Sequence, residues 1–335
     1  MILLDSLYIN DKGGGKILLD YIIKKFEEEK LPIFYLLDAR VTYDQLPDDR
    51  KLYLKSSSYN RFLFYKKNAS KFSIIFCFAN LAPPIKLTVP VYTYFHQSMY
   101  VNGPLYLNRS FKIKFFFKKL FFKYLLKNTH YLVVQTSLIQ SSLVEKFNFP
   151  ISKILVLPIY DEPLYHQNVV REKNTFLYVS SGSPHKNHLR LLKAFCKFYD
   201  LYQTGKLFLT VDKSSFPILI NEIDLIIKCG YPIVNIGHVN RDELFPYYYK
   251  SEYLIYPSLE ESFGLGLLEA IDCGYQVIGA DLPYTHEVCS PSYLFDPFSV
   301  ESIFRALELS FLGGHQQSQK KIHNSLNSLI QFFKI

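Results

Sequence analysis

The chain has 335 residues, of which 49% are hydrophobic and 20% charged, and its formal net charge is +8. This length exceeds the usual size of a single core, so we expect two domains of roughly 100 to 200 residues, and the composition excludes a mainly disordered chain. The five cysteines lie scattered without metal-binding spacing, which argues against a zinc site and against a disulfide scaffold.

The N-terminal residues "MILLDSLYINDKGGG" have no basic stretch before the apolar run and no pattern of small residues for cleavage. No uninterrupted apolar run approaches the roughly 18 residues that cross a bilayer. We therefore expect a cytoplasmic protein.

In the first half of the chain, short apolar runs alternate with helical patterns. The first run, at residues 2–9, is followed by the turn "NDKGGGK" and by an amphipathic helix expected at 17–29. Runs that are apolar on both faces and alternate with helices are typical of a parallel sheet covered on both sides. Further strands of this kind are expected at residues 32–38, 72–79, 89–96, 130–136 and 153–159.

At residues 161–174 the periodicity stops and polar residues predominate, so we place an interdomain linker there. The alternation then restarts, with strands expected at 175–181, 206–212, 233–239, 253–257 and 276–281 and helices at 188–201, 214–229, 242–249 and 263–273. We predict an α/β protein of two doubly wound Rossmann-like domains facing a cleft, at residues 1–160 and 175–315. The remaining residues, 316–335, are predicted to form a C-terminal helix that packs back on the first domain.

The positive charge is concentrated in "RSFKIKFFFKKLFFKYLLK", from Arg109 to Lys127, which contains no acidic residue. One interpretation is a helix whose aromatic residues pack on a core while its lysines face water. The other is a basic amphipathic helix lying on an anionic membrane surface. No nucleic-acid recognition module accompanies this segment, so we do not expect nucleic acid as a partner.

Two features of the first domain follow strands, where ligands of α/β sheets bind. The glycines of "GGG", which include Gly14 and Gly15, precede the first helix and let a phosphate or sugar approach the backbone; they are equally typical of a flexible turn. His96 ends the run "VYTYFH", where it either contacts a substrate hydroxyl or is a structural residue.

The loop "SSGSPHKNH" follows the first strand of the second domain. Its Ser181 and Ser183 hydroxyls are potential hydrogen-bond donors, and Lys186 offers a charge-assisted contact to a diphosphate. The alternative is an ordinary strand-to-helix loop in which Asn187 caps the helix.

The stretch "PSLEESFGLGLLEAIDCG" contains Glu261 before an expected helix and Glu269 within its apolar face. Gly274 suits a left-handed C-terminal cap. Backbone amides at a helix start attract anions, and a nearby carboxylate is best satisfied by neutral hydroxyls. Sugar hydroxyls could donate hydrogen bonds to both glutamates. The simpler alternative is that one glutamate caps the helix and the other is merely tolerated within it.

These residues resemble a known family. The stretch from Pro257 to Val288 is similar to the E-x7-E signature of the retaining glycosyltransferases of family four, which have the GT-B fold, and "LYVSSGSPHKNHLRLLKAF" resembles that family's diphosphate loop. The resemblance is specific over about residues 175–290. In the first domain it is loose.

The resemblance implies a role for each matching residue. Glu261 would hold hydroxyls of the transferred sugar, and Glu269 would bind the nucleotide ribose. Lys186 would neutralise the leaving diphosphate, with Gly14, Gly15 and His96 contacting the donor from the first domain. The further donor-binding positions are Ser181, Ser183, Ser262, Phe263, Gly264 and Leu265, with His238 and Val239 near the base.

One departure from the family pattern concerns the diphosphate loop. Many relatives have an arginine shortly before the lysine, whereas this chain has Ser181 and His185. Stabilisation of the leaving group would then rest more heavily on Lys186. No DxD-like motif is present, so we expect no metal and no cofactor besides the donor substrate.

The resemblance thus implies a hexosyltransferase that moves a sugar, with retention, from a nucleotide-diphosphate sugar to a lipid-linked or oligosaccharide acceptor. O-antigen, lipopolysaccharide or capsule synthesis is the expected pathway, with the enzyme associated peripherally with the inner face of the cell membrane through Arg109 to Lys127. Two alternatives remain, a sugar-nucleotide epimerase of the same fold and a non-catalytic protein that binds the membrane surface.

Overall fold

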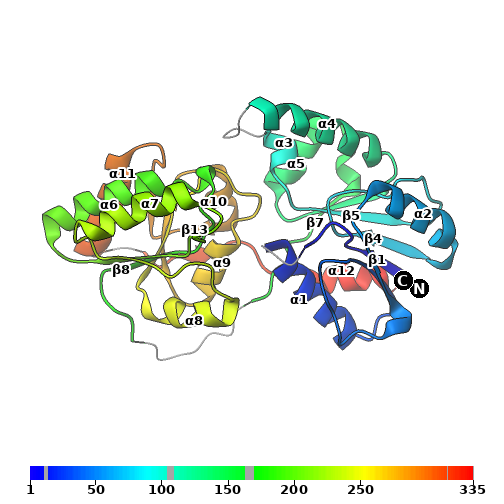
Figure 1. Cartoon of the computed structure of the whole chain (residues 1–335), viewed down its shortest axis with the longest axis horizontal. Helices are drawn as coiled ribbons and strands as arrows, with labels where there is room; N and C mark the ends of the chain where they lie inside the picture. The colour runs from blue at the N-terminus through cyan, green and yellow to red at the C-terminus, as the bar shows by residue number, and fades with distance from the viewer. Residues whose placement is uncertain (11–13, 104–108, 163–169, 315, 335) are drawn as a thin grey trace. The chain divides into compact units, whose positions relative to one another are not determined.

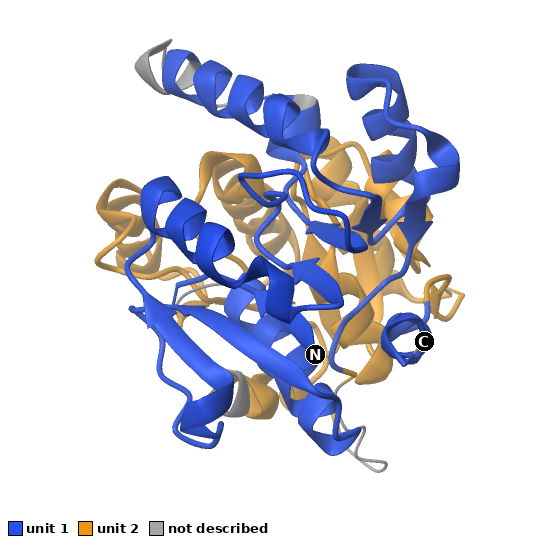
Figure 2. Ribbon diagram, turned by 90° about the vertical axis from the view of Figure 1, so that its right-hand side faces the viewer, with its two compact units in different colours: residues 1–161, 323–335 blue, residues 162–322 orange. Residues whose placement is uncertain are grey.

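The computed structural model describes residues 1–10, 14–103, 109–162, 170–314 and 316–334. The chain divides into two compact units, which Figure 2 shows in different colours. Unit 1 comprises residues 1–161 and 323–335, and unit 2 comprises residues 162–322. The boundary lies at the start of the predicted linker, of which residues 163–169 fall outside the described residues.

Unit 1 is a parallel sheet of seven strands in the order β3-β2-β1-β4-β5-β6-β7, and α-helices connect most of the strands that follow one another in the chain (Figure 1). Its strands are β1 (Ile2–Asp5), β2 (Ile33–Asp38), β3 (Lys51–Leu54), β4 (Ile74–Cys77), β5 (Val91–Phe95), β6 (Tyr131–Val134) and β7 (Ile154–Val156). Its helices are α1 (Gly14–Glu28), α2 (Ser58–Asn68), α3 (Met99–Asn102), α4 (Arg109–Leu126), α5 (Ser137–Phe147) and α12 (Leu326–Phe333).

The C-terminal helix α12 belongs to unit 1 although its sequence follows unit 2. Its buried face is Leu326, Leu329, Ile330 and Phe333, and these side chains are part of the core on the α1 side of the sheet. The Phe333 ring lies 5.7 Å from Phe26 of α1 and 5.3 Å from Phe76 of β4, centroid to centroid. Burial of this apolar face therefore holds the end of the chain against unit 1.

Unit 2 contains a parallel sheet of six strands in the order β10-β9-β8-β11-β12-β14. These strands are β8 (Thr175–Tyr178), β9 (Lys206–Leu209), β10 (Ile233–Asn235), β11 (Tyr253–Tyr256), β12 (Gln276–Ala280) and β14 (Tyr293–Phe295). The helices are α6 (His188–Tyr202), α7 (Pro217–Lys228), α8 (Arg241–Lys250), α9 (Leu265–Asp272), α10 (Pro283–Val288) and α11 (Val300–Leu312). A short antiparallel pair joins β13 (Cys289–Ser290) to β15 (Gln319–Lys320).

Short 3-10 turns complete both units. They are η1 (Asp48–Arg50), η2 (Ala69–Lys71) and η3 (Ile151–Lys153) in unit 1 and η4 (Pro184–Lys186) in unit 2. The last of these lies in the loop after β8 and carries the lysine predicted to contact a diphosphate.

The α/β class and the parallel sheets predicted from the apolar runs are confirmed. Among the described residues four strands were missed: β13 and β15 of the short antiparallel pair, and β3 and β14, each of which lies at an edge of its parallel sheet. An edge strand is paired on one side only and covered less, so it does not need a continuous apolar run. Indeed no residue of β3 is fully buried, and Leu52 is exposed.

Candidate active site

In unit 2 the candidate site lies at the carboxyl edge of the sheet, where the loops after neighbouring strands β8 and β11 meet. Lys186 ends η4 in the first of these loops, and Glu261 lies in the second. The Lys186 Nζ donates to Glu261 Oε1 across 2.5 Å. Their side chains are 15% and 12% exposed, so the pair is largely shielded from water.

Backbone and amide hydrogen bonds hold the two loops together. The amide of Leu259 donates to the carbonyl of His185 across 2.7 Å. The Asn187 side chain donates to the carbonyls of Pro257, at 3.1 Å, and Pro297, at 2.7 Å. Asn187 lies at the N-cap position of α6, as the alternative predicts, but its side chain makes no capping hydrogen bond, because its amide donates to these two carbonyls.

Tyr256, the last residue of β11, completes the surroundings of Glu261. Its hydroxyl donates to Glu261 Oε1 across 2.9 Å, the same oxygen that accepts from Lys186. Burial, and then the Glu261 carboxylate, raise the pKa of Tyr256 well above its ordinary value. The phenol therefore remains a hydrogen-bond donor near neutral pH. This residue was missed, although its place at the carboxyl end of a strand was a usable signal.

The helix after Glu261 begins later than predicted. Residues 263–273 were expected to be helical, but α9 runs over Leu265–Asp272 because Gly264 has φ +76, outside the helical region. Phe263 and Gly264 are therefore buried loop residues just before the helix, beside Ser262. The prediction for Gly274 is confirmed, since it has φ +76 directly after the helix.

Glu269 is half-buried on α9, as its place in the apolar face predicts. The hydroxyl of Tyr248 on α8 donates to Glu269 Oε2 across 3.3 Å. Burial, and then the charge of Glu269, raise the pKa of Tyr248 well above its ordinary value. Glu269 thus lies toward α8, whereas Glu261 lies toward the loop after β8.

The remaining predicted residues of unit 2 lie at the same sheet edge, since all its strands from β8 to β12 run parallel. The Ser181 and Ser183 hydroxyls are 3.0 Å apart in the loop after β8. His238 and Val239 follow β10, at the end of the sheet order. Burial, and then the charge of Lys186, lower the pKa of His185, so its imidazole is neutral near neutral pH.

In unit 1, His96 follows β5 and is held by Asn80. The backbone amide of His96 donates to Asn80 Oδ1 across 2.7 Å, and the Asn80 amide lies 3.3 Å from His96 Nε2. Burial lowers the pKa of His96 to about 4, so the imidazole is neutral near neutral pH. Asn80 positions this ring, and the sequence analysis missed it.

Gly15 lies beside His96, since a Cβ at Gly15 would come 3.8 Å from His96 Nε2. The helix α1 begins at Gly14, three residues earlier than predicted, so Gly14 and Gly15 form its first turn. Both residues lie within α1, and neither has a positive φ. Gly13 of the same run lies outside the described residues.

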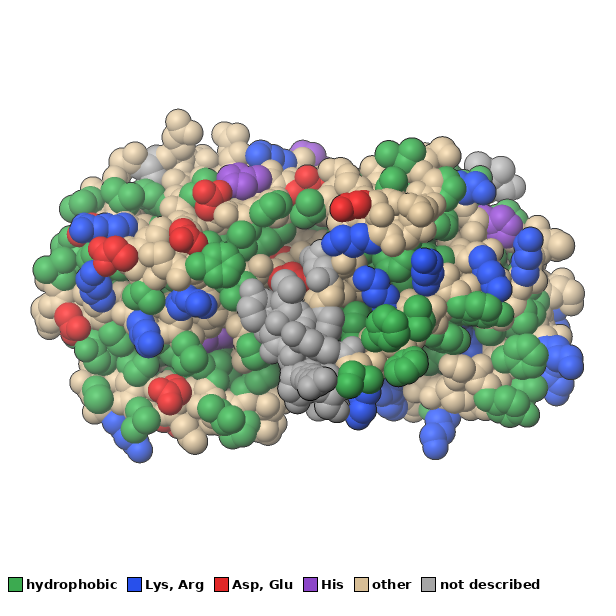
Figure 3. Space-filling view, turned by 90° about the horizontal axis from the view of Figure 1, so that it is seen from above, with side chains coloured by type: hydrophobic (Ala, Val, Ile, Leu, Met, Phe, Trp, Pro, Cys, Tyr) green, Lys and Arg blue, Asp and Glu red, His purple; other side chains and the backbone are tan. Residues whose placement is uncertain are grey.

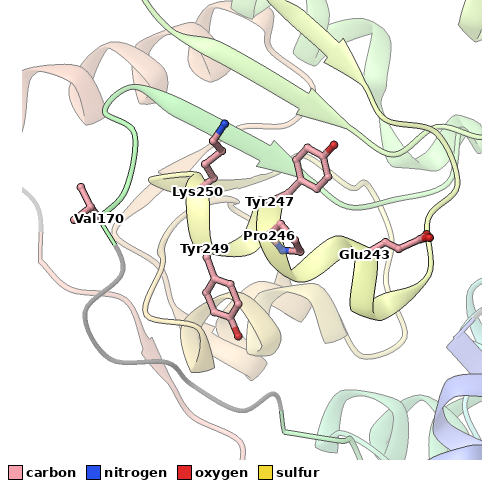
Figure 4. A pocket seen from close by; sticks show the side chains of 6 residues that line it. All are labelled: Val170, Glu243, Pro246, Tyr247, Tyr249 and Lys250. Carbon is pink, nitrogen blue, oxygen red and sulfur yellow. The ribbon is translucent and has the colours of Figure 1, made fainter.

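A pocket of about 670 Å³ lies along α8 of unit 2 (Figure 4). Its lining contains none of the predicted site residues; it consists of Val170, Glu243, Pro246, Tyr247, Tyr249 and Lys250. We place the candidate site at Lys186 and Glu261 instead, because there a shielded charge pair lies where two loops converge at the sheet edge.

Within the described residues, no group of three or more His, Cys, Asp or Glu side chains could hold a metal ion. Metal independence stays a prediction.

Residues 161–324 match the family of glycosyl transferases group 1. The O-antigen chain mannosyltransferase RfbU of Salmonella typhimurium is 27% identical over 188 residues, which cover 54% of this chain and 51% of RfbU. The chain therefore spans about half the length of this curated relative.

Solved structures show that the fold extends over both units. Anabaena HepE in complex with UDP and glucose has a TM-score of 0.66 at 13% identity, covering 91% of this chain and 88% of HepE. WaaG, a glycosyltransferase involved in lipopolysaccharide biosynthesis, has a TM-score of 0.68 at 13% identity, covering 93% and 91%. The predicted GT-B fold class is confirmed; the arrangement of the units across a cleft stays a prediction.

Proposed function

We propose that the protein is a retaining glycosyltransferase that moves a hexose from a nucleotide-diphosphate sugar to a lipid-linked or oligosaccharide acceptor. The product would enter a surface polysaccharide such as O-antigen, lipopolysaccharide or capsule. The observation that carries the proposal is the shielded contact between Lys186 and Glu261 in a group 1 glycosyl transferase segment.

This pair matches the chemistry of a nucleotide-sugar donor. Lys186 and Glu261 each neutralise the other, and separating them in a shielded place is costly unless both find new partners. A diphosphate accepts hydrogen bonds from an ammonium, and a sugar hydroxyl donates to a carboxylate. A nucleotide sugar carries its diphosphate on the anomeric carbon of a ring that also bears hydroxyls, so it can replace both halves of the ion pair at once.

The relatives support the same class of substrate. HepE was solved with UDP and glucose, and RfbU is named a mannosyltransferase of the O-antigen chain. We therefore propose a hexose as the transferred sugar, with mannose the first to test.

The residues would act mainly by charge stabilisation. Lys186 would stabilise the negative charge that develops on the diphosphate as the bond to the sugar breaks, and Glu261 would hold sugar hydroxyls. Glu269 would bind the ribose, Ser181 and Ser183 the phosphates, and the backbone near His238 and Val239 the base. In unit 1, a neutral His96 beside Gly15 would offer a hydrogen bond to the sugar, since its pKa of about 4 makes it a weak base.

The test is incubation of the full chain with GDP-mannose and other nucleotide sugars, with and without lipid-linked glycan acceptors. The proposal predicts acceptor-dependent transfer with retained anomeric configuration and slow donor hydrolysis without acceptor. Conversion of the donor to an isomer without any acceptor would instead identify an epimerase. No transfer or hydrolysis from any donor, together with unchanged nucleotide binding by Glu269→Ala, would reject the site assignment.

A further inference from the structure

The helix α4 of unit 1 has an apolar face that the protein leaves uncovered. Its core face contributes Phe115, Phe122 and Leu126 to the hydrophobic cluster beside β5 and β6. On the helix surface, large apolar side chains are also exposed: Ile113 at 55%, Phe117 at 63%, Leu120 at 48% and Tyr124 at 57%. The exposed set needs an explanation, because the described parts of the fold do not bury these side chains.

The exposed side chains form a regular stripe. The spacing of residues 113, 117, 120 and 124 places them within an arc of about 60° on an α-helix, roughly opposite the core face. Phe116, at 58%, and Phe121, at 41%, lie on either side of this stripe. The helix is therefore apolar on two opposite faces, of which the fold uses one.

Lysines flank the exposed stripe on both sides. Lys114 and Lys118 lie along one border and Lys123 and Lys127 along the other, and all four are exposed. The segment from Arg109 to Lys127 contains no acidic residue. Figure 3, viewed from the side on which α4 lies in Figure 1, shows hydrophobic and basic side chains intermixed over this part of unit 1.

The cationic border continues beyond the helix. A pocket of about 390 Å³ opens at the C-terminal end of α4, lined by Pro84, Ile85, Lys86, Tyr124, Lys127 and Asn128. The Lys127 Nζ lies 3.7 Å from the centre of the Tyr124 ring. An amphipathic aromatic side chain beside an ammonium is the arrangement that suits the boundary between lipid headgroups and acyl chains.

We infer that this face of α4 docks on an anionic lipid bilayer, with Ile113, Phe117, Leu120 and Tyr124 entering the headgroup boundary and the flanking lysines contacting lipid phosphates. A bilayer receives the apolar stripe and the positive charge together. A second copy of the chain does not fit, because it would bring the same lysines against one another with no acidic residue on the face to compensate. None of the described helices has the length and apolar composition that spanning a bilayer requires.

The inference goes beyond the proposed function, because it depends only on the surface of unit 1. A chain that binds vesicles but transfers no sugar would retain this inference and lose the proposed function. A chain that transfers sugar to a water-soluble acceptor but does not bind vesicles would support the proposed function and contradict this inference.

The first experiment is co-sedimentation of the full chain with vesicles of phosphatidylcholine containing phosphatidylglycerol, and with vesicles of phosphatidylcholine alone. We expect binding to the first only. Replacing both Phe117→Ser and Leu120→Ser should lower the partition coefficient about tenfold or more, since two large apolar side chains leave the interface. Replacing both Lys118→Gln and Lys123→Gln should lower it roughly twenty-five-fold, because each lysine contributes a factor of about five near an anionic surface.

Exposed residues of unit 2 provide matched controls. Ile218→Ser on α7, where the side chain is 82% exposed, and Lys193→Gln on α6 should leave vesicle binding unchanged. Since all these positions are exposed, every variant should keep the thermal midpoint of the parent chain. Equal binding by the parent chain and the Phe117/Leu120 variant, or equal binding to neutral and anionic vesicles, would overturn the inference.

A second experiment uses the absence of tryptophan from the sequence. Phe117→Trp introduces the only tryptophan of the chain into the stripe, and the emission of this indole should shift to shorter wavelength with anionic vesicles. Ile218→Trp should show no shift. A lipid-independent dimer that the Phe117/Leu120 variant abolishes, or binding of nucleic acid that abolishes the vesicle shift, would assign the face to another partner and reject the bilayer.

Discussion

The Nζ of Lys186 lies 2.5 Å from Oε1 of Glu261, although 75 residues separate them in the chain. Lys186→Gln removes the positive charge while keeping a polar side chain of similar reach. We expect the affinity for GDP or UDP to fall about tenfold to a hundredfold, since hydrogen bonds to charged groups contribute about 1.5–3 kcal/mol. Isothermal titration calorimetry measures this, with Lys193→Gln on α6 as the control. Unchanged affinity in Lys186→Gln would remove Lys186 from the diphosphate site.

Glu261→Gln tests the other half of the pair. It leaves the Lys186 ammonium shielded without its anionic partner, so we expect a loss of about 1–3 kcal/mol in the free energy of unfolding. If Glu261 holds the sugar, kcat should also fall while the affinity for the nucleoside diphosphate alone does not. Denaturant unfolding and steady-state kinetics separate the two effects, with Glu222→Gln on the exposed surface of α7 as the control. A kcat equal to that of the parent chain would contradict the role in the sugar site.

Tyr256→Phe removes the hydroxyl that donates to Glu261. Tyr253→Phe is its matched control, because the hydroxyl of Tyr253 on the same strand donates to the carbonyl of Ser310 across 2.9 Å. Both variants should lose about 1 kcal/mol of unfolding free energy. Only Tyr256→Phe should lower the transfer rate, because only that hydroxyl orients Glu261. Equal transfer rates in the two variants would mean that Tyr256 has a structural role alone.

Gly15→Ala should separate stability from activity. The new methyl group would lie 3.5 Å from Ile9 Cδ1 and 3.8 Å from His96 Nε2, which are ordinary contacts. Where the native backbone suits alanine, replacing glycine by alanine stabilises by about 0.4–1 kcal/mol, because the unfolded chain loses conformational freedom. We expect a higher thermal midpoint with a lower transfer rate, since the methyl group narrows the space beside His96. In Gly14→Ala the methyl meets open space, so it serves as the comparison. An undiminished transfer rate in Gly15→Ala would argue against a ligand at this position.

Two buried histidines predict a loss of stability in acid. Burial lowers the pKa of His96 to about 4 and that of His188 to about 3, against an ordinary value of 6.5. Between the lowered and the ordinary values the unfolded chain binds more protons than the folded one, so stability falls as the pH decreases below 6.5. Thermal unfolding between pH 7 and about pH 4 measures this slope. His188→Gln should reduce the slope, whereas an identical slope in that variant would show that other groups cause it.

Most interior strands were predictable because both of their faces are buried. The run "FSIIFCFA" predicts a strand, and β4 occupies its centre at Ile74–Cys77. The edge strands β3 and β14 gave no such signal, since an edge requires less apolar covering. The start of α9 was predicted two residues early because helical periodicity does not reveal that Gly264 adopts a left-handed conformation.

Part of the candidate site was predictable, because its residues follow strands that the sequence predicts. Lys186 and Glu261 each follow a predicted strand, and the carboxyl ends of parallel strands lie at one edge of a sheet. Their spacing in the chain does not reveal that they touch. Asn80 and Asn187 were not predicted as site-positioning residues, because each acts through a hydrogen bond to another loop. Tyr256 was also missed, although Glu261, to which it donates, is only five positions further along the chain.

The sequence by itself determined the α/β class, the positions of most strands along the chain and the loops that carry the candidate residues. These features depend on local apolar patterning and backbone freedom. Tertiary structure alone decided that Lys186 pairs with Glu261, that Gly15 lies beside His96, and that α4 buries one apolar face and exposes the other. Those relationships depend on which strands become neighbours and on which side of a helix meets the sheet. Both are decided by packing between segments far apart in the chain.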